Sequence, residues 1–156
     1  MAYTDIITLA DAKTYLRIDD TLTEDDAQIT RMIKASLSQI ERATNYILFA
    51  RSKSYVVEDL SVNVYDYPIN SLTTPTTATS VEKSIYTTYT TVVATDLKVT
   101  LNVGYVDPLD VPSDLIEVAF EMIDLMYYSP ETGKSIKSDL SELSKMVLSN
   151  YKRFFI

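Results

Sequence analysis

The side chains that usually carry enzyme chemistry are almost entirely missing from this chain. It contains no cysteine and no histidine, so thiolate nucleophiles, disulfides and the usual general base and zinc ligand are excluded. The two glycines, Gly104 and Gly133, cannot form a glycine-rich phosphate loop. The adjacent acids Glu58 and Asp59 are better explained by an exposed turn than by acid–base catalysis. We therefore expect neither a catalytic residue nor a bound cofactor.

A cluster of acids is the one arrangement that could bind a metal ion. Its members surround the start of a predicted long helix: Asp19, Asp20, Glu24, Asp25 and Asp26. A calcium loop needs alternating ligands and a central glycine, and the cluster has neither. Carboxylates at a helix start are stabilised by the positive end of the helix dipole. We interpret the cluster as a helix-start signal and expect no metal site.

Charged residues at helical spacing form two candidate interaction surfaces. The basic stripe consists of Arg31, Lys34 and Arg42, and the acidic stripe consists of Asp114, Glu117, Glu121 and Asp124. Each stripe is expected to lie opposite the apolar face of its helix, and a solvated surface is the alternative reading. Like charges at this spacing destabilise an isolated helix by about 0.2–0.5 kcal/mol per pair. The acidic stripe therefore predicts compensating contacts or a functional need for negative potential.

Apolar periodicity predicts the helices that position these stripes. A long amphipathic helix is expected over 23–48, with Thr23 as its N-cap, and a capping signature at Thr8 and Asp11 predicts a short helix before it. Another helix is expected from Val111 until just before Pro130. A last helix is predicted over 138–151, with this inward face: Leu140, Leu143, Val147, Tyr151 and Phe154.

Two-residue alternation between the helices indicates strands at 54–58, 61–65, 84–93 and 97–105, with a threonine-rich loop at 72–80. The predicted fold is α+β, mostly helical, with an inserted antiparallel β-sheet. We expect a single domain over 1–156, made of a helical part (1–50), a β insertion (51–106) and C-terminal helices with a tail (111–156).

Composition limits the class of protein further. A chain of 156 residues with 46% hydrophobic content can bury one core, and it has no apolar run long enough to span a membrane. A net charge of −8 argues against a surface that grips nucleic acid, although DNA could pass such a surface without binding. The given sequence ends in an apolar tail, Phe154, Phe155 and Ile156, which directly follows Lys152 and Arg153 and is expected to contact a partner.

The order and spacing of several segments resemble the head–tail connector (adaptor) proteins of tailed bacteriophages. The segments are ITLADAKTYLRID, TEDDAQITRMIKASLSQIERATN, LKVTLNVGY, VPSDLIEVAFEMIDLMYYSPE and the closing SNYKRFF. Residues 66–95 are the least similar, which leaves the contacts of the threonine-rich segment 72–95 open.

This resemblance implies a structural protein of the virion neck, assembled in the host cytoplasm. It implies a ring of twelve identical subunits below the portal protein, which extends the DNA channel and provides a docking surface for a stopper or tail protein. The C-terminal segment of such proteins engages the portal, so residues 152–156 are the expected portal-binding residues here. Some charges of the two stripes are expected to pair between neighbouring subunits or to line the channel, where acidic residues would repel the phosphates of passing DNA.

Three alternatives stay open at this point. The chain could be another neck component, such as a tail-completion or stopper protein. It could be a DNA-binding regulator that uses the basic stripe as a recognition helix, but net acidity and the lack of a compact helix-turn-helix pair argue against this. An enzyme is disfavoured by the missing reactive side chains.

Overall fold

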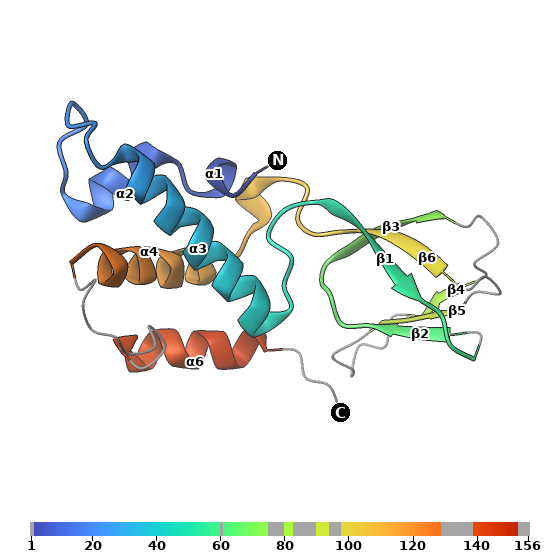
Figure 1. Cartoon of the computed structure of the whole chain (residues 1–156). Helices are drawn as coiled ribbons and strands as arrows, with labels where there is room; N and C mark the ends of the chain where they lie inside the picture. Colours follow the sequence, from blue (N-terminus) through green and yellow to red (C-terminus); the bar gives the residue numbers. More distant parts are fainter. Residues whose placement is uncertain are drawn as a thin grey trace. The chain divides into compact units, whose positions relative to one another are not determined.

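The computed structural model describes residues 2–59, 61–74, 80–82, 90–93, 98–128 and 139–152 (Figure 1). The helices are α1 (Tyr3–Ile6), α2 (Leu9–Leu16), α3 (Asp26–Thr44), the 3-10 turn η1 (Pro108–Asp110), α4 (Ser113–Tyr128) and α6 (Glu142–Tyr151). The strands are β1 (Arg51–Val56), β2 (Ser61–Val64), β3 (Ile69–Thr74), β4 (Ser80–Glu82), β5 (Thr90–Val93) and β6 (Lys98–Val103). This confirms the predicted α+β fold with antiparallel sheets.

The chain forms two compact units. The helical unit contains Met1–Thr44 and Asp107–Lys152, and the β unit contains Asn45–Val106. The two crossings between the units lie close to the predicted edges of the β insertion, at residues 51 and 106. Within the described residues, no helix is long and apolar enough to cross a membrane.

Helix α2 begins where the capping signature predicted. The amide of Asp11 donates to Thr8 Oγ1 (3.1 Å), and the amide of Thr8 donates to Asp11 Oδ2 (3.0 Å). These two bonds satisfy amides that have no partner inside the helix. The helix ends at Leu16, because the next residue, Arg17, has a left-handed φ of 58° that turns the chain out of the helix.

Helix α3 supplies the centre of the helical core. Its fully buried apolar residues are Ile29, Ile33, Leu37 and Ile40. Burying such a side chain contributes about 1.5–3 kcal/mol. The helix is shorter than predicted: Thr23 accepts the amide of Asp26 with its backbone carbonyl (3.3 Å) and so precedes the helix, and Asn45 ends it with a left-handed φ of 61°.

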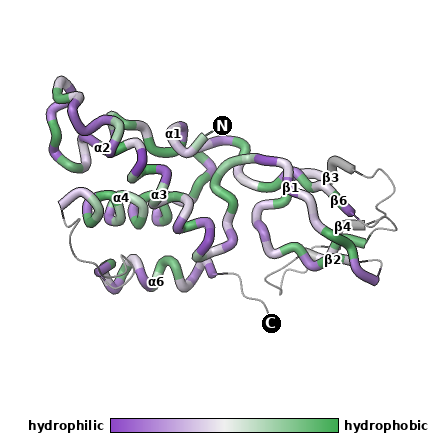
Figure 2. The backbone as a smooth tube through the Cα atoms, in the orientation of Figure 1, coloured by the Kyte–Doolittle hydropathy of each residue, from purple (hydrophilic) through white to green (hydrophobic). Residues whose placement is uncertain are grey.

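Helix α4 packs against α2, α3 and α6, and it is more hydrophobic than α3 (Figure 2). Its buried residues match the predicted face: Leu115, Val118, Ala119, Met122 and Ile123. Because α4 has neighbours on three sides, only a narrow strip of its surface is left for polar residues.

Helix α6 differs from its prediction in start and in phase. Ser141 caps it by accepting the amide of Ser144 (3.2 Å), and the helix proper begins at Glu142 rather than at about 138. The predicted inward residue Leu143 is 67% exposed, whereas Leu140, Ser144 and Leu148 are buried. The placement of Leu143 was wrong because a polar residue, Ser144, occupies the inner face through a hydrogen bond to α4.

The β unit consists of two three-stranded antiparallel sheets, ordered β1-β6-β3 and β2-β5-β4. In the first sheet Arg51 pairs with Val103 and Val56 with Lys98. The alternation predicted for β6 is confirmed, because Val99, Leu101 and Val103 are fully buried between more exposed neighbours.

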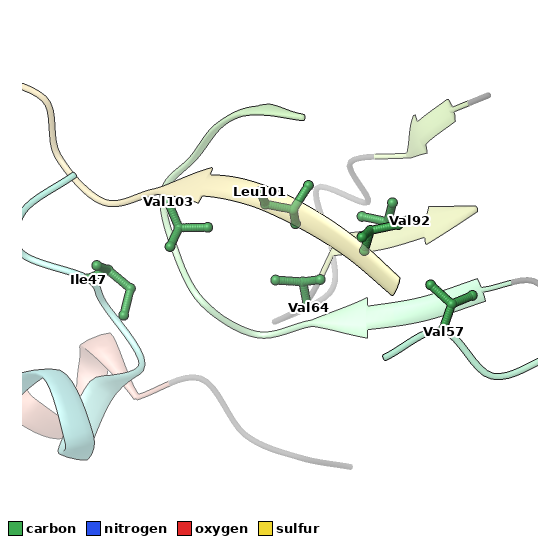
Figure 3. Close-up of a cluster of buried hydrophobic side chains, with 7 residues drawn as sticks. Ile47, Val57, Val64, Val92, Leu101 and Val103 are labelled. Atoms are coloured by element: carbon green, nitrogen blue, oxygen red, sulfur yellow. The ribbon is translucent and has the colours of Figure 1, made fainter. Parts of the chain in front are cut away.

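Side chains from both sheets share one apolar cluster (Figure 3). Its buried members are Ile47, Val57, Val64, Val92, Val99, Leu101 and Val103. The cluster therefore gives the β unit a core of its own.

The threonine-rich loop predicted over 72–80 was wrong at both of its ends. Residues 72–74 continue β3, where Leu72 pairs with Leu101 and Thr74 with Thr100, and Ser80 begins β4. Composition missed these strands because their hydrogen-bond partners are far away in the sequence. Residues 90–93 of the strand predicted over 84–93 form β5, while 84–89 and Leu97 lie outside the described residues.

Gly104 connects β6 to the chain that leaves the β unit, and its geometry excludes a side chain. Its φ is 106°, and a Cβ atom there would lie 2.3 Å from the carbonyl oxygen of Phe49. We predict that Gly104→Ala lowers the free energy of unfolding by about 2–4 kcal/mol, because the backbone and Phe49 must both shift. Urea denaturation measures this loss. Lys98→Ala, at an exposed site on β6, is the control and should change stability by less than about 0.5 kcal/mol; equal losses for the two variants would contradict the prediction.

Candidate functional site

The basic stripe lies on the solvent side of α3. Arg31, Lys34 and Arg42 are all exposed; Arg31 and Arg42 are opposite the buried residues of the same helix, and Lys34 lies at the edge of the buried face. Arg42 donates to Ser38 Oγ (3.3 Å). Among the residues that the structure describes, no carboxylate forms an ion pair with any of the three cations.

The acidic stripe of α4 divides into two parts. Glu117 and Asp124 lie seven residues apart on the outward strip of the helix, and neither has a hydrogen bond or ion pair within the described part of the chain. Asp114 and Glu121 lie toward α6 and are bonded to it. The structure thus keeps two of the four predicted residues available and uses the other two inside the subunit.

Glu121 fixes the start of α6. Its Oε1 accepts the amide of Ser141 (2.5 Å), and its Oε2 accepts the hydroxyls of Ser141 (3.0 Å) and Ser144. Burial raises the pKa of this carboxyl, but the hydrogen bonds from Ser144 and Ser141, with the nearby charge of Lys145, outweigh burial and lower the pKa below its ordinary value. These donors are the compensating contacts that the like charges of the stripe required.

Asp114 holds the other end of α6. Its Oδ1 accepts the hydroxyl of Tyr151 (3.0 Å) and also the amide of Leu115 (3.0 Å) in the first turn of α4. A carboxylate at that position is favoured by the helix dipole. Asp114 and Glu121 therefore join α4 to both ends of α6.

Tyr15 and Phe120 form an aromatic pair that the sequence did not single out. Their rings are stacked, with centroids 4.8 Å apart and an interplanar angle of 13°. They line a shallow groove of about 420 Å³ between α2 and α4, together with Ile6, Asp11, Thr14 and Ile116. The phenol of Tyr15 has a raised pKa, because of burial and then the negative charges of Asp124, Glu117 and Glu121. The available part of the acidic stripe therefore acts electrostatically on this groove.

The acids near the start of α3 have structural contacts. Asp26 Oδ1 lies 2.5 Å from the Nζ of Lys13, which is only 3% exposed and also donates to the carbonyls of Leu22 (2.6 Å) and Asp20 (3.3 Å). Asp25 accepts the hydroxyl of Tyr127 (2.8 Å). No group of three or more potential metal ligands gathers anywhere in the described ranges.

The buried position of Lys13 was missed, although a signal was present. Leu9, Ala12, Lys13 and Leu16 follow the spacing of an inward helix face, so Lys13 occupies an apolar position of that pattern.

The acidic pair in the β unit and the C-terminal tail are the two remaining predicted sites. Glu58 and Asp59 form a turn, in which the amide of Glu58 donates to the carbonyl of Ser61 (3.2 Å) and Asp59 has a left-handed φ of 50°. Lys152 is exposed directly after α6, and the remaining tail residues, Arg153, Phe154, Phe155 and Ile156, lie outside the described residues.

The contacts of Glu121 predict a local, pH-dependent effect on α6. Glu121→Gln should lower the free energy that holds α6 on α4 by about 1–2 kcal/mol. The neutral amide oxygen of glutamine accepts weaker hydrogen bonds from Ser141 and Ser144 than the ionised carboxylate does. Because folding lowers the pKa, the carboxylate stabilises fully above the unfolded value near 4.5, and the difference between wild type and variant shrinks as the pH falls through the folded pKa. Hydrogen exchange of the α6 amides measures it. Glu117→Gln, one turn earlier and exposed, is the matched control; faster α6 exchange in both variants would count against this role.

Comparison with known proteins places this geometry in a family. Residues 6–93 match the family described as "Phage gp6-like head-tail connector protein". No curated protein sequence matches the chain significantly.

Three solved structures of gene transfer agent (GTA) particles contain chains with the same fold. A chain of the "Neck of empty GTA particle computed with C6 symmetry" has a TM-score of 0.77 and 15% identity, over 99% of this chain and 92% of that one. A chain of the native virion has a TM-score of 0.75 and 13% identity, over 100% and 94%. A chain of the "Neck of native GTA particle computed with C12 symmetry" has a TM-score of 0.74 and 11% identity, over 99% and 92%.

The family match spans more than half of the chain, including α2, α3 and the first strands. The resemblance inferred from the sequence segments is thereby confirmed. The chain belongs to the phage gp6-like head–tail connector family, whose members join the head of a phage particle to its tail.

Proposed function

We propose that copies of this chain form a closed ring in the neck of a phage particle, between the portal protein and a stopper or tail protein. The observation that carries the proposal is the opposite charge on two outward faces of the helical unit, basic on α3 and acidic on α4. The connector family and the C12 symmetry of a similar neck structure support a ring of twelve.

The two faces point in different directions because of how the core is built. The apolar side of α3 packs against the apolar side of α4, so the outward sides of the two helices are turned away from each other. A ring needs such an arrangement, since one surface of each subunit must meet a different surface of the next. Arg31, Lys34 and Arg42 of one copy would face Glu117 and Asp124 of its neighbour.

The channel of this ring would let the genome pass without holding it. Each copy carries a net charge of −8, and negative surfaces repel the phosphates of DNA. The ring would act by shape and charge, without catalysis. The apolar residues of the tail, Phe154, Phe155 and Ile156, would bind the portal.

Pairing between the two charged faces makes ring assembly sensitive to charge reversal. Glu117→Lys combined with Asp124→Lys should abolish rings, because both faces then carry positive charge. Adding Arg31→Glu with Arg42→Glu should restore them by reversing both partners. Electron microscopy of the neck of assembled particles measures ring formation. Asp20→Lys with Glu24→Lys makes the same charge change at two exposed acids and should leave rings intact; loss of rings in this control, or intact rings in the first variant, would refute the pairing.

Binding to the portal should depend on the residues that follow Lys152. A chain that ends after Lys152 should keep its urea midpoint, because α6 ends at Tyr151 and every contact described above is retained. Its binding to the portal protein should fall by about tenfold or more, since apolar anchors carry most of the affinity of an interface. Co-purification with the portal measures binding. Leu143→Ser removes an exposed apolar side chain from α6 and serves as the control; unchanged portal binding by the truncated chain would remove the tail from the proposed interface.

A further inference from the structure

The groove at Tyr15 and Phe120 has the features of a site for a cationic side chain. The rings of Tyr15 and Phe120 both line it and each covers one face of the other, while Tyr15 is 44% exposed. A cation over the face of such a ring is attracted by the electron density of the ring. The groove is open and shallow, so it fits one side chain of a protein rather than a deeply enclosed small ligand.

Charge at the groove specifies the sign of its occupant. Glu117 and Asp124 lie on the outward strip of α4 next to Phe120, and both act on the phenol of Tyr15. Within the part of the chain that the structure describes, no basic side chain pairs with either of them. An occupant that stacks on the ring of Tyr15 and donates to these carboxylates combines a planar shape with several N–H groups, which describes a guanidinium.

The chain itself carries a matching group on its opposite face. Arg31 is exposed on the outward side of α3 and has no side-chain partner among the described residues. Arg42 already donates to Ser38, and the ammonium of Lys34 lacks the planar shape that stacks on aromatic rings. Arg31 does not line the groove of its own subunit, and it lies on the side of α3 opposite the buried residues of that helix. It can reach the groove of another copy.

We propose that the groove between α2 and α4 of one copy receives the guanidinium of Arg31 from the next copy. The guanidinium stacks on the face of Tyr15 that Phe120 leaves uncovered, and it donates to Glu117 and Asp124. This inference rests on the proposed ring and identifies its central contact. It turns a general attraction between charged faces into a fixed register between neighbouring subunits.

The natural absence of cysteine allows a direct test of this register. Thr14→Cys places a thiol in the groove, and Gln28→Cys places one on α3 a single turn before Arg31; both positions are exposed. Particles assembled with the doubly substituted chain are treated with a short bismaleimide, and their proteins are separated by denaturing electrophoresis. We expect a ladder of covalent oligomers that extends to the full ring. Each single-cysteine chain, with one thiol per copy, can give a dimer at most.

Substitutions in the doubly substituted background identify the side chains responsible. Arg31→Glu and Tyr15→Leu should each reduce the ladder by about tenfold, whereas Tyr15→Phe should preserve it because the aromatic face remains. Arg42→Glu makes the same charge change on the same face and should reduce it far less. Equal effects of Arg31→Glu and Arg42→Glu would show that only general charge matters and would overturn the assigned contact.

Failure of this contact can be separated from failure of the ring. If electron microscopy shows rings of the doubly substituted chain in the neck while the bismaleimide gives no oligomers beyond the single-cysteine controls, the contact is wrong and the ring stands. If wild-type particles contain no ring of this chain in the neck, the proposed function and the contact are both refuted.

Discussion

Burial of one side of α3 is the constraint on which the helical unit depends. Four fully buried side chains, Ile29, Ile33, Leu37 and Ile40, fix the direction of that helix toward its neighbours. At about 1.5–3 kcal/mol each, their burial is large compared with the few tenths of a kcal/mol that an exposed charge contributes. The position of the basic stripe is therefore a consequence of the core. The same core directs the outward strip of α4 away from α3. The packing of α3 against α4 therefore determines the position of both charged faces.

Hydrogen-bonded charged side chains stabilise the segments of the helical unit that bury few apolar side chains. Helix α6 buries few apolar side chains, and Glu121 and Asp114 compensate by accepting donors from its start and its end. Lys13 does the same for the turn before α3, where it joins two carbonyls and the carboxylate of Asp26. A buried cation with three oxygen partners avoids most of the cost of losing water. Acids that looked like a uniform stripe or cluster in the sequence thus have separate tasks in the structure.

Helix positions and the alternation of β6 could be predicted from the sequence, because both follow from periodic burial and local caps. The inward face of α6 could not, since the hydrogen bond between Ser144 and Glu121 joins residues far apart in the sequence and makes a polar residue face inward. The start of β3 and β4 within a threonine-rich segment was missed for the same reason, because pairing with distant strands decides it. Of the candidate site, the basic stripe lies where periodicity placed it. The groove was not foreseeable, because stacking of Tyr15 on Phe120 depends on how α2 meets α4.

The charge of the whole chain explains why opposite charges would have to be concentrated on two faces. Copies that each carry −8 repel one another, and this repulsion grows as more copies gather in one ring. Where the basic stripe of one copy meets the acidic strip of the next, the electrostatic repulsion between the copies becomes an attraction. The rest of the surface stays negative and continues to repel DNA. Exposed ion pairs contribute at most about 1 kcal/mol each, so a pair of copies held by them alone is weak. In a closed ring every copy uses both faces, and the last contact forms within one assembly rather than between free molecules, which raises its effective concentration. Weak contacts between pairs of copies are therefore compatible with a stable ring. An arginine bound in the aromatic groove would fix the register between neighbouring copies, which exposed charges alone do not specify.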